Sequence, residues 1–302
     1  MKKIIFTLPL IFATLGVQGQ NSDKFTGALL WKITGNGLES PCYIFGTHHL
    51  ADTAFAESYP GLLEALIGAV QVVGEIEMSE MATAQNAMMM HAAMPAGTTY
   101  RSLLSPADYE RLDALLKDQI GAGLDQIGNF KPAMISNIIA MRLMSEAMPA
   151  YNPLTHVSID QYVQDKGKAN GAKVLGLETA NDQIRALFYA DPLETQAQAL
   201  ICSLGEMKHG KESVLKLNEV YAAGDLFGAY EMAFDDPENP CPMSEESAAA
   251  LNKDRNDKWI DQLPGIFADG PAFVAVGMLH LCGEEGLLCR LDRLGYAVEA
   301  MR

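Results

Sequence analysis

Apolar runs of four to seven residues alternate with longer, helix-like stretches along most of the chain. Most of these runs are rich in β-branched or aromatic residues and lie close to glycine, proline or asparagine, a pattern typical of strands. We expect six strands, at residues 29–33, 42–45, 70–76, 173–177, 272–276 and 296–300. Because helical stretches separate most of them, the pattern predicts an α/β fold with a central, mostly parallel sheet flanked by helices.

Two features refine this expected organisation. Gly35-Asn36-Gly37 separates the first two strands and is typical of a hairpin turn. Residues 78–157 are largely helical, and we expect them to form a cap inserted into the α/β fold. No internal repeat or long linker divides the remainder, so the sequence predicts a single domain over residues 27–302.

The N-terminus has the pattern of a secretory signal peptide. Lys2 and Lys3 precede a mostly apolar stretch at residues 4–15, and Gly19 supplies a small residue at a plausible cleavage position. The apolar stretch is shorter than the roughly 20 residues that a transmembrane helix needs. We therefore expect residues 1–19 to be removed, leaving an exported protein, periplasmic or secreted, without a transmembrane segment.

The charge balance excludes some classes of binding partner. The chain carries 22 lysine and arginine residues against 38 aspartate and glutamate residues, a formal charge of −16. Nucleic-acid binding and polybasic membrane binding both depend on clustered cations, so the composition argues against these classes. Hydrophobic residues make up 49% of the chain, which is enough for a large core. A peptide or another small molecule is among the partners that this charge does not exclude.

Export makes disulfide bonds possible. Five cysteines remain after cleavage, an odd number that leaves at least one without a partner inside the chain. We expect Cys202 to pair with Cys241, because Cys241 lies in a proline-rich, loop-like stretch that could reach a helix end. Other pairings stay open, since spacing alone does not determine connectivity. No C-x-x-C pattern for a structural zinc site is present.

The residues that directly follow the predicted strands carry the candidate chemistry. Gly-x-x-His turns follow two strands and end at His49 and His280, while Glu75 and Glu178 follow two others. Ligands of open α/β sheets bind beyond the carboxyl ends of the strands. Parallel strands would therefore gather these four side chains at one edge of the sheet.

Two imidazoles and a carboxylate are a common ligand set for a divalent metal. His49, Glu75 and His280 form such a set. If the strand continues through Glu77, then Glu75 and Glu77 point to the same face, and one could bind the metal while the other orients a histidine. The alternative is ordinary: a histidine after a strand is often a hydrogen-bonded turn residue, and a glutamate there is often solvated.

Arg255 is a further candidate, on a predicted helix that also contains Trp259. Its guanidinium could clamp a carboxylate or stabilise a developing oxyanion. The alternative interpretation is a helix-surface ion pair with an acid such as Asp261.

Several motifs occur in a fixed order from about Leu29 to the C-terminus. They are Phe45-Gly46-Thr47-His48-His49, Val73-Gly74-Glu75-Ile76-Glu77, Phe130-Lys131-Pro132, Ser158-Ile159-Asp160, Gly176-Leu177-Glu178-Thr179 with Gln183, Arg255-Asn256, Val276-Gly277-Met278-Leu279-His280-Leu281 and Leu294-Gly295-Tyr296. On these motifs the chain resembles the TraB/PrgY/GumN family, to which the Tiki metalloproteases are similar. The resemblance implies a fold like that of erythromycin esterase-like and ChaN-like proteins.

Carried over by position, the resemblance implies a site of His49, Glu75 and His280, with Glu178 and Arg255 as supporting polar residues. His48 lies next to the matched position but is not the matched histidine. Two positions depart from the family pattern. Glu77 stands where the family often has aspartate, and Asp254 stands where it often has glutamate.

The leading hypothesis is an exported, metal-dependent hydrolase, a Tiki-like peptidase that cleaves a peptide or amide bond. Manganese, cobalt or zinc held by the two histidines and Glu75 would activate water, with Glu77 or Glu178 as the general base and Arg255 stabilising the oxyanion. The rival hypothesis is a non-catalytic periplasmic ligand-binding or accessory protein of the same fold.

Overall fold

The computed structural model describes residues 24–149, 151–152 and 155–302. The predicted signal peptide at 1–19 lies outside these residues. The strands are β1 (Leu30–Gly35), β2 (Cys42–Thr47), β3 (Gln71–Gly74), β4 (Lys173–Gly176), β5 (Ala272–Gly277) and β6 (Tyr296–Met301). They confirm the six predicted strands, with ends that differ by at most two residues.

All six strands form one sheet in the order β4-β3-β5-β2-β1-β6. Neighbours from β4 to β2 run parallel, whereas β1 pairs antiparallel with both β2 and β6. The hairpin between β1 and β2 turns through Gly35, Asn36 and Gly37, all with positive φ angles of 78°, 48° and 83°, which these residue types tolerate best. The predicted mostly parallel sheet is therefore confirmed, and four strands end at the same edge.

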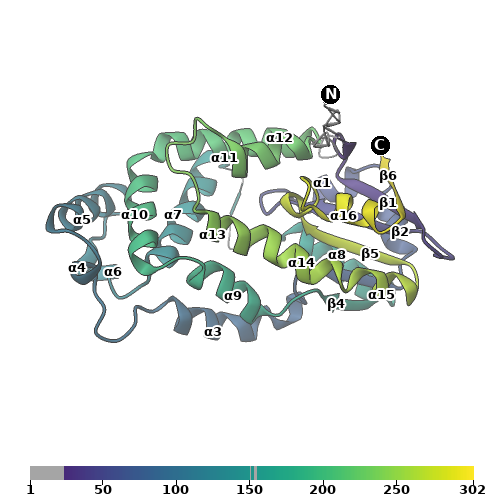
Figure 1. Cartoon of the computed structure of the whole chain (residues 1–302), viewed down its shortest axis with the longest axis horizontal. Helices are drawn as coiled ribbons and strands as arrows, with labels where there is room; N and C mark the ends of the chain where they lie inside the picture. The colour runs from purple at the N-terminus through teal and green to yellow at the C-terminus, as the bar shows by residue number, and fades with distance from the viewer. Residues whose placement is uncertain (1–23, 150, 153–154) are drawn as a thin grey trace, which may run out of the picture.

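The helices flank the sheet and extend well beyond it. The longer ones and the helical turns are α1 (Thr53–Ser58), α2 (Leu62–Ile67), η2 (Met78–Glu80), α3 (Met81–Ala92), α4 (Tyr100–Leu103), α5 (Pro106–Ile120), α6 (Leu124–Ile127), α7 (Pro132–Ala147), α8 (Ile159–Ala169), α9 (Ala180–Tyr189), α10 (Leu193–Gly205), α11 (Met207–Ala222), α12 (Leu226–Tyr230), η3 (Glu231–Asp235), α13 (Glu245–Ala248), η4 (Ala249–Lys253), α14 (Asp254–Ile260), α15 (Leu263–Ala268), η5 (Met278–His280) and α16 (Leu287–Arg293). Figure 1 shows the sheet at one end of the long axis and α4, α5 and α6 at the other. No helix in the described ranges has the length and apolar character to cross a bilayer.

The predicted cap at 78–157 is not confirmed as an insertion with a core of its own. Helices α5 and α7 from that region pack against α10, and α7 also packs against α11, both of which follow β4 (Figure 1). Leu112 and Ile135 from the first segment share one apolar cluster with Leu200 and Leu204 from the second. Two segments that are distant in sequence therefore build the helical part together.

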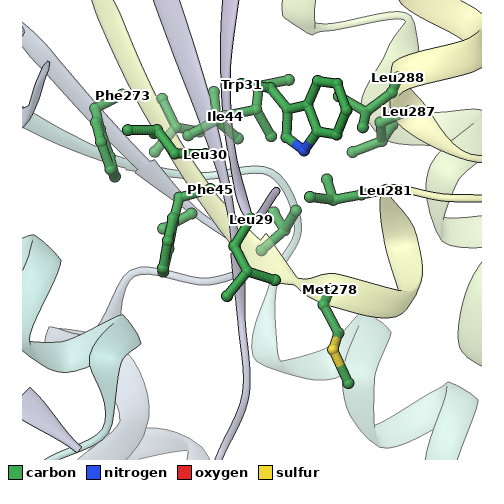
Figure 2. Close-up of a cluster of buried hydrophobic side chains, with 14 of the residues drawn as sticks. Leu29, Leu30, Trp31, Ile44, Phe45, Phe273, Met278, Leu281, Leu287 and Leu288 are labelled. Carbon is green, nitrogen blue, oxygen red and sulfur yellow. The ribbon is translucent and has the colours of Figure 1, made fainter. Parts of the chain in front are cut away.

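The core beside the sheet is formed by the strands and by helices from both halves of the chain. Figure 2 shows Trp31 of β1 close to Leu281, Leu287 and Leu288. Its indole N–H donates a hydrogen bond to the carbonyl oxygen of Ala28, 3.1 Å away, so the one polar atom of this side chain is satisfied. This burial anchors the segment after β5 on the sheet.

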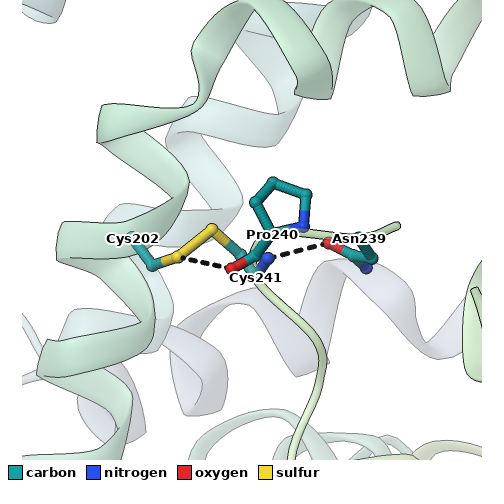
Figure 3. Close-up of a disulfide and its surroundings, with 4 residues drawn as sticks. All are labelled: Cys202, Asn239, Pro240 and Cys241. Carbon is teal, nitrogen blue, oxygen red and sulfur yellow. Dashed lines mark hydrogen bonds between the residues drawn. A yellow bond between two sulfur atoms is a disulfide. The ribbon is translucent and has the colours of Figure 1, made fainter. Parts of the chain in front are cut away.

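A disulfide bond joins Cys202 of α10 to Cys241 in the loop before α13 (Figure 3), as predicted. The two Cα atoms are 5.8 Å apart, and 39 residues separate the cysteines in sequence. The backbone N–H of Cys241 also donates to Oδ1 of Asn239, 2.9 Å away, which shapes the loop. Cys42 and Cys282 are buried thiols.

Helix α8 packs closely on the parallel strands and carries polar residues to their carboxyl ends. A Cβ atom at Gly167 would lie 2.3 Å from Cγ2 of Val72, so only glycine permits this approach of α8 to β3. About one turn earlier in the helix, Nε2 of Gln164 donates to the carbonyl oxygen of Ile76 at 2.8 Å, and its Oε1 accepts from the N–H of Met78 at 2.8 Å. The helix thus holds the segment that follows β3.

We predict that Gly167→Ala lowers the free energy of unfolding by about 1–3 kcal/mol, because the added methyl overpacks against Val72. The matched control is Gly265→Ala in α15, where a Cβ would meet no atom within 4 Å. That change should be neutral or stabilising by up to about 1 kcal/mol, since alanine favours helix. Urea unfolding of both variants measures the difference. Equal stability of the two variants would contradict the packing argument.

Candidate active site

The polar residues at the carboxyl ends of the strands meet around the guanidinium of Arg255. Its Nη2 lies 2.5 Å from Oε2 of Glu75 and 2.6 Å from Oε1 of Glu178, and its Nε lies 3.1 Å from both oxygens of Glu178. The Arg255 and Glu178 side chains are only 12% and 2% exposed. Arg255 therefore joins two glutamates from neighbouring strands, and the alternative surface pair with Asp261 is not what the structure contains.

His280 is the fourth member of this cluster and is neutral. Its Nε2 is 3.0 Å from Nη1 of Arg255. Because arginine can only donate, Nε2 accepts, and the ring proton lies on Nδ1, which donates to Oδ1 of Asn256 at 2.8 Å. Burial lowers the pKa of His280 to about 4, and the positive charge of Arg255 lowers it further against the opposing effect of Glu75.

Glu75 is held by donors on both oxygens. Oε1 accepts from the backbone N–H of Gly277 at 2.8 Å, and Oε2 accepts from Arg255 and, at 3.4 Å, from Nε2 of Gln183. Burial by itself raises the pKa of Glu75, but the charge of Arg255 and the hydrogen bond from the N–H of Gly277 outweigh it and lower the pKa to about 2. Glu75 is thus an ionised, fixed carboxylate.

The glycines of the two Gly-x-x-His turns are needed for close approach. A Cβ at Gly46 would lie 3.1 Å from the Cα of Met278, which belongs to the turn after β5. A Cβ at Gly277 would lie 3.1 Å from Oε1 of Glu75. Neither glycine has a positive φ angle. The two turns therefore pack against each other and against Glu75 because no side chain intervenes.

His49 lies apart from Arg255, beside Asp160 of α8. Its side chain is 77% exposed, with Nδ1 4.0 Å from Oδ2 of Asp160. Oδ1 of Asp160 accepts from the hydroxyl of Thr47 at 2.8 Å. Burial raises the pKa of Asp160, and the charge of Glu75 adds to this, while His49 and the bond from Thr47 oppose it. A carboxyl group and an imidazole thus face each other at the end of β2.

His49, Asp160 and Glu75 line one cavity of about 220 Å³, together with Ser158, Gln164 and Gln183. We call it the sheet-edge cavity. No role was predicted for Asp160, although Ser158-Ile159-Asp160 is among the motifs shared with the family. This motif is the sequence feature that could have pointed to Asp160. Its position next to His49, however, depends on the packing of α8 on β3.

Glu77 does not join this cavity. Strand β3 ends at Gly74, so the alternation that would place Glu75 and Glu77 on one face does not extend that far. Oε1 of Glu77 accepts from the hydroxyl of Ser79 at 2.6 Å, and the residue lines a different cavity, of about 230 Å³. The condition for a shared face, a strand that continues through Glu77, is therefore not met.

The predicted metal ligands do not form an open ligand set as they are placed. Nε2 of His280 accepts from Arg255, and both oxygens of Glu75 are already hydrogen-bonded. Across the described ranges, no group of three or more histidine, cysteine, aspartate or glutamate side chains is spaced to hold a metal ion. The arrangement therefore does not fit a metal unless Arg255 moves away from His280.

These features define a class of α/β protein in which histidines and carboxylates from four parallel strands line one sheet edge. The model of the TraB/PrgY/gumN family matches residues 29–300, nearly the whole described chain, and the chain belongs to this family. Comparison with curated proteins and with solved structures gave no match.

The histidines of this region predict a pH dependence of stability. Burial lowers the folded-state pKa of His280 to about 4, and burial together with His49 lowers that of His48 to about 4, against 6.5 for a free imidazole. Between these values the unfolded chain binds more protons, so stability falls as the pH drops from about 6.5 to about 4. We expect His280→Gln and His48→Gln each to reduce proton uptake on unfolding by about one proton.

The measurement is the free energy of unfolding at several pH values for the wild type and each variant. A slope that stays the same after both substitutions would contradict the assignment. His48 tests the pH dependence separately from His280, because its surroundings differ. Its buried Nε2 has no hydrogen-bond partner among the described residues, and its ring lies 5.1 Å from that of Tyr221.

Proposed function

We propose that this protein is a hydrolase that cleaves a peptide or amide bond in the sheet-edge cavity. The observation that carries the proposal is geometric: His49, Asp160 and Glu75, from three separate elements, line the same cavity. The opposite pKa shifts of Glu75, lowered, and Asp160, raised, support it. Carboxyl groups whose pKa values are pushed apart in one site are typical of acid–base catalysis.

The residues suggest a division of roles. His49 accepts a proton from water as the water oxygen attacks the carbonyl carbon, and it then delivers this proton to the nitrogen of the departing amine. Asp160 orients the imidazole and stabilises its protonated form, as a carboxylate does in the serine-protease triad. The separation of 4.0 Å is longer than a hydrogen bond, and such contacts commonly tighten when substrate binds.

Arg255, Glu75 and Glu178 act as positioning residues in this proposal. Arg255 pairs with both carboxylates and offsets part of their negative charge, and Glu75 holds the turn after β5 through the N–H of Gly277. The proposal does not include the oxyanion role expected for Arg255 or the general-base role expected for Glu178, because these two side chains are hydrogen-bonded to each other.

We extend the proposal to a divalent ion, manganese, cobalt or zinc, on one condition. His49, Glu75 and His280 would hold it only after Arg255 has left Nε2 of His280. Elemental analysis of the purified protein beside Glu75→Ala tests this point independently of activity.

We also propose that the protein is exported to the periplasm or secreted. The disulfide between Cys202 and Cys241 supports this, since such bonds persist mainly in oxidising compartments. The rival function, ligand binding without catalysis, is favoured by one observation. Glu75, Glu178 and His280 are all occupied by Arg255, which leaves His49 as the exposed member of the predicted site.

The test is a peptide-library cleavage screen, run with a chelator and with each of the three metals. We expect His49→Ala to lower kcat/KM by about a hundredfold to ten-thousandfold, the usual contribution of a general base. Asp160→Asn should reduce kcat with little change in KM. His209→Ala in α11 is the control and should retain activity. Binding of peptides without cleavage under every condition would establish the rival function.

A further inference from the structure

A second cavity, of about 540 Å³, lies next to the sheet-edge cavity. We call it the α9–α14 cavity; its lining includes Asp182, Arg185 and Tyr189 of α9, Arg255 and Lys258 of α14, and His91 of α3. Its volume is within the range of small-molecule sites. Arg255 lines it while contacting Glu75 of the sheet-edge cavity, so one guanidinium lies where the two cavities adjoin.

The first turn of α9 also contributes residues to both cavities. Asp182 lines the α9–α14 cavity, and the next residue, Gln183, lines the sheet-edge cavity and donates to Glu75. A ligand that occupies both cavities would therefore cross Arg255 and the beginning of α9. This places the larger cavity where a substrate would extend from the proposed catalytic groups.

The cations of the α9–α14 cavity are only partly compensated. Asp182 accepts from the N–H and the hydroxyl of Thr179 at 3.1 and 2.6 Å, and lies 3.6 Å from Nζ of Lys258. Its charge is therefore used by the helix cap and by Lys258. Arg185, one turn further along α9, is exposed and forms no hydrogen bond or ion pair with another described residue.

A buried lysine adds to this charge from behind the lining. Lys131 is 4% exposed, and its Nζ lies 3.7 Å from the ring centroid of Tyr189. Within the described ranges it has no carboxylate partner. The hydroxyl of Tyr189 lies 2.7 Å from Nδ1 of His91 on the other side. The Tyr189 end of the cavity therefore has a cation beneath its aromatic ring.

The charged residues of the α9–α14 cavity determine which kind of ligand it can bind. In the lining, Arg185 and Lys258 stand against Asp182 and Asp254, so these charges cancel, and Asp182 is already engaged by the cap of α9 and by Lys258. The chain as a whole has 22 cations against 38 acids. A lining that lacks the negative excess of the whole chain, and that contains the exposed guanidinium of Arg185 without a partner among the described residues, indicates a site for an anion.

We propose that the α9–α14 cavity binds the free carboxylate of a peptide or acylated amino acid. The planar guanidinium of Arg185 matches a carboxylate with two parallel hydrogen bonds, and Lys258 adds a third donor. Ala186, Ala190 and Ala250 provide apolar lining for the neighbouring small side chain. That this ligand is a substrate rests on the proposed function, whereas its binding does not.

The experiment compares two probes, N-acetyl-tetraalanine with a free C-terminus and the same peptide as its amide. Isothermal titration calorimetry is carried out on the full mature chain carrying His49→Ala, so that no hydrolysis accompanies binding. We expect the free acid to bind about tenfold more tightly than the amide, the strength of a charge-assisted bidentate pair. Arg185→Gln should abolish this preference, and Lys258→Gln should reduce it.

Arg111→Gln is the matched control, because Arg111 is also an exposed helical arginine but lies on α5, outside the cavity. It should keep the tenfold preference. Equal affinity for acid and amide in the parent protein, or an unchanged preference after Arg185→Gln, would overturn the proposal.

The result is separable from the test of hydrolysis. A preference for the free acid that depends on Arg185, in a protein that cleaves no peptide, would leave the carboxylate site intact and remove the proposed function. Cleavage that depends on His49, without any preference for the free acid, would do the reverse.

Discussion

The buried contact of Arg255 with Glu75 and Glu178 is the interaction on which the organisation of the sheet edge depends. Three charges leave water together, and removal of one partner from such a group usually costs about 3–5 kcal/mol because another charge is left uncompensated. The partners come from α14 and from the segments after β3 and β4. A stable fold therefore requires that these segments meet in one arrangement.

The same contact determines what the neighbouring groups can do. By donating to Nε2, Arg255 holds His280 as a neutral imidazole with its proton on Nδ1. It also occupies Glu75, so the two strongest predicted metal ligands are bound to a cation that belongs to the protein. His49 is the member of the predicted site that remains open to solvent, and it faces Asp160, which is why the proposed mechanism is centred on these two residues.

Much of the fold could be predicted because it follows from local patterns. Apolar runs determine the strands, and the stretches between them determine that most strands run parallel, so the gathering of Glu75, Glu178 and His280 at one edge was also predictable. Glu77 was misplaced because the strand stops at Gly74, a boundary that depends on packing and not on residue type. The cap is not confirmed as an insertion, because its helices pack against helices that follow β4.

The sequence by itself determined which residue types follow each strand, which cysteines could pair and which classes of partner the negative charge excludes. Only the tertiary structure decided their contacts: that Arg255 pairs with two glutamates, that Asp160 faces His49, and that Arg185 lines a second cavity. The physical reason is that ion pairs and cavities depend on distances between segments far apart in the chain. Those distances are set by the packing of whole helices on the sheet, which residue spacing does not encode.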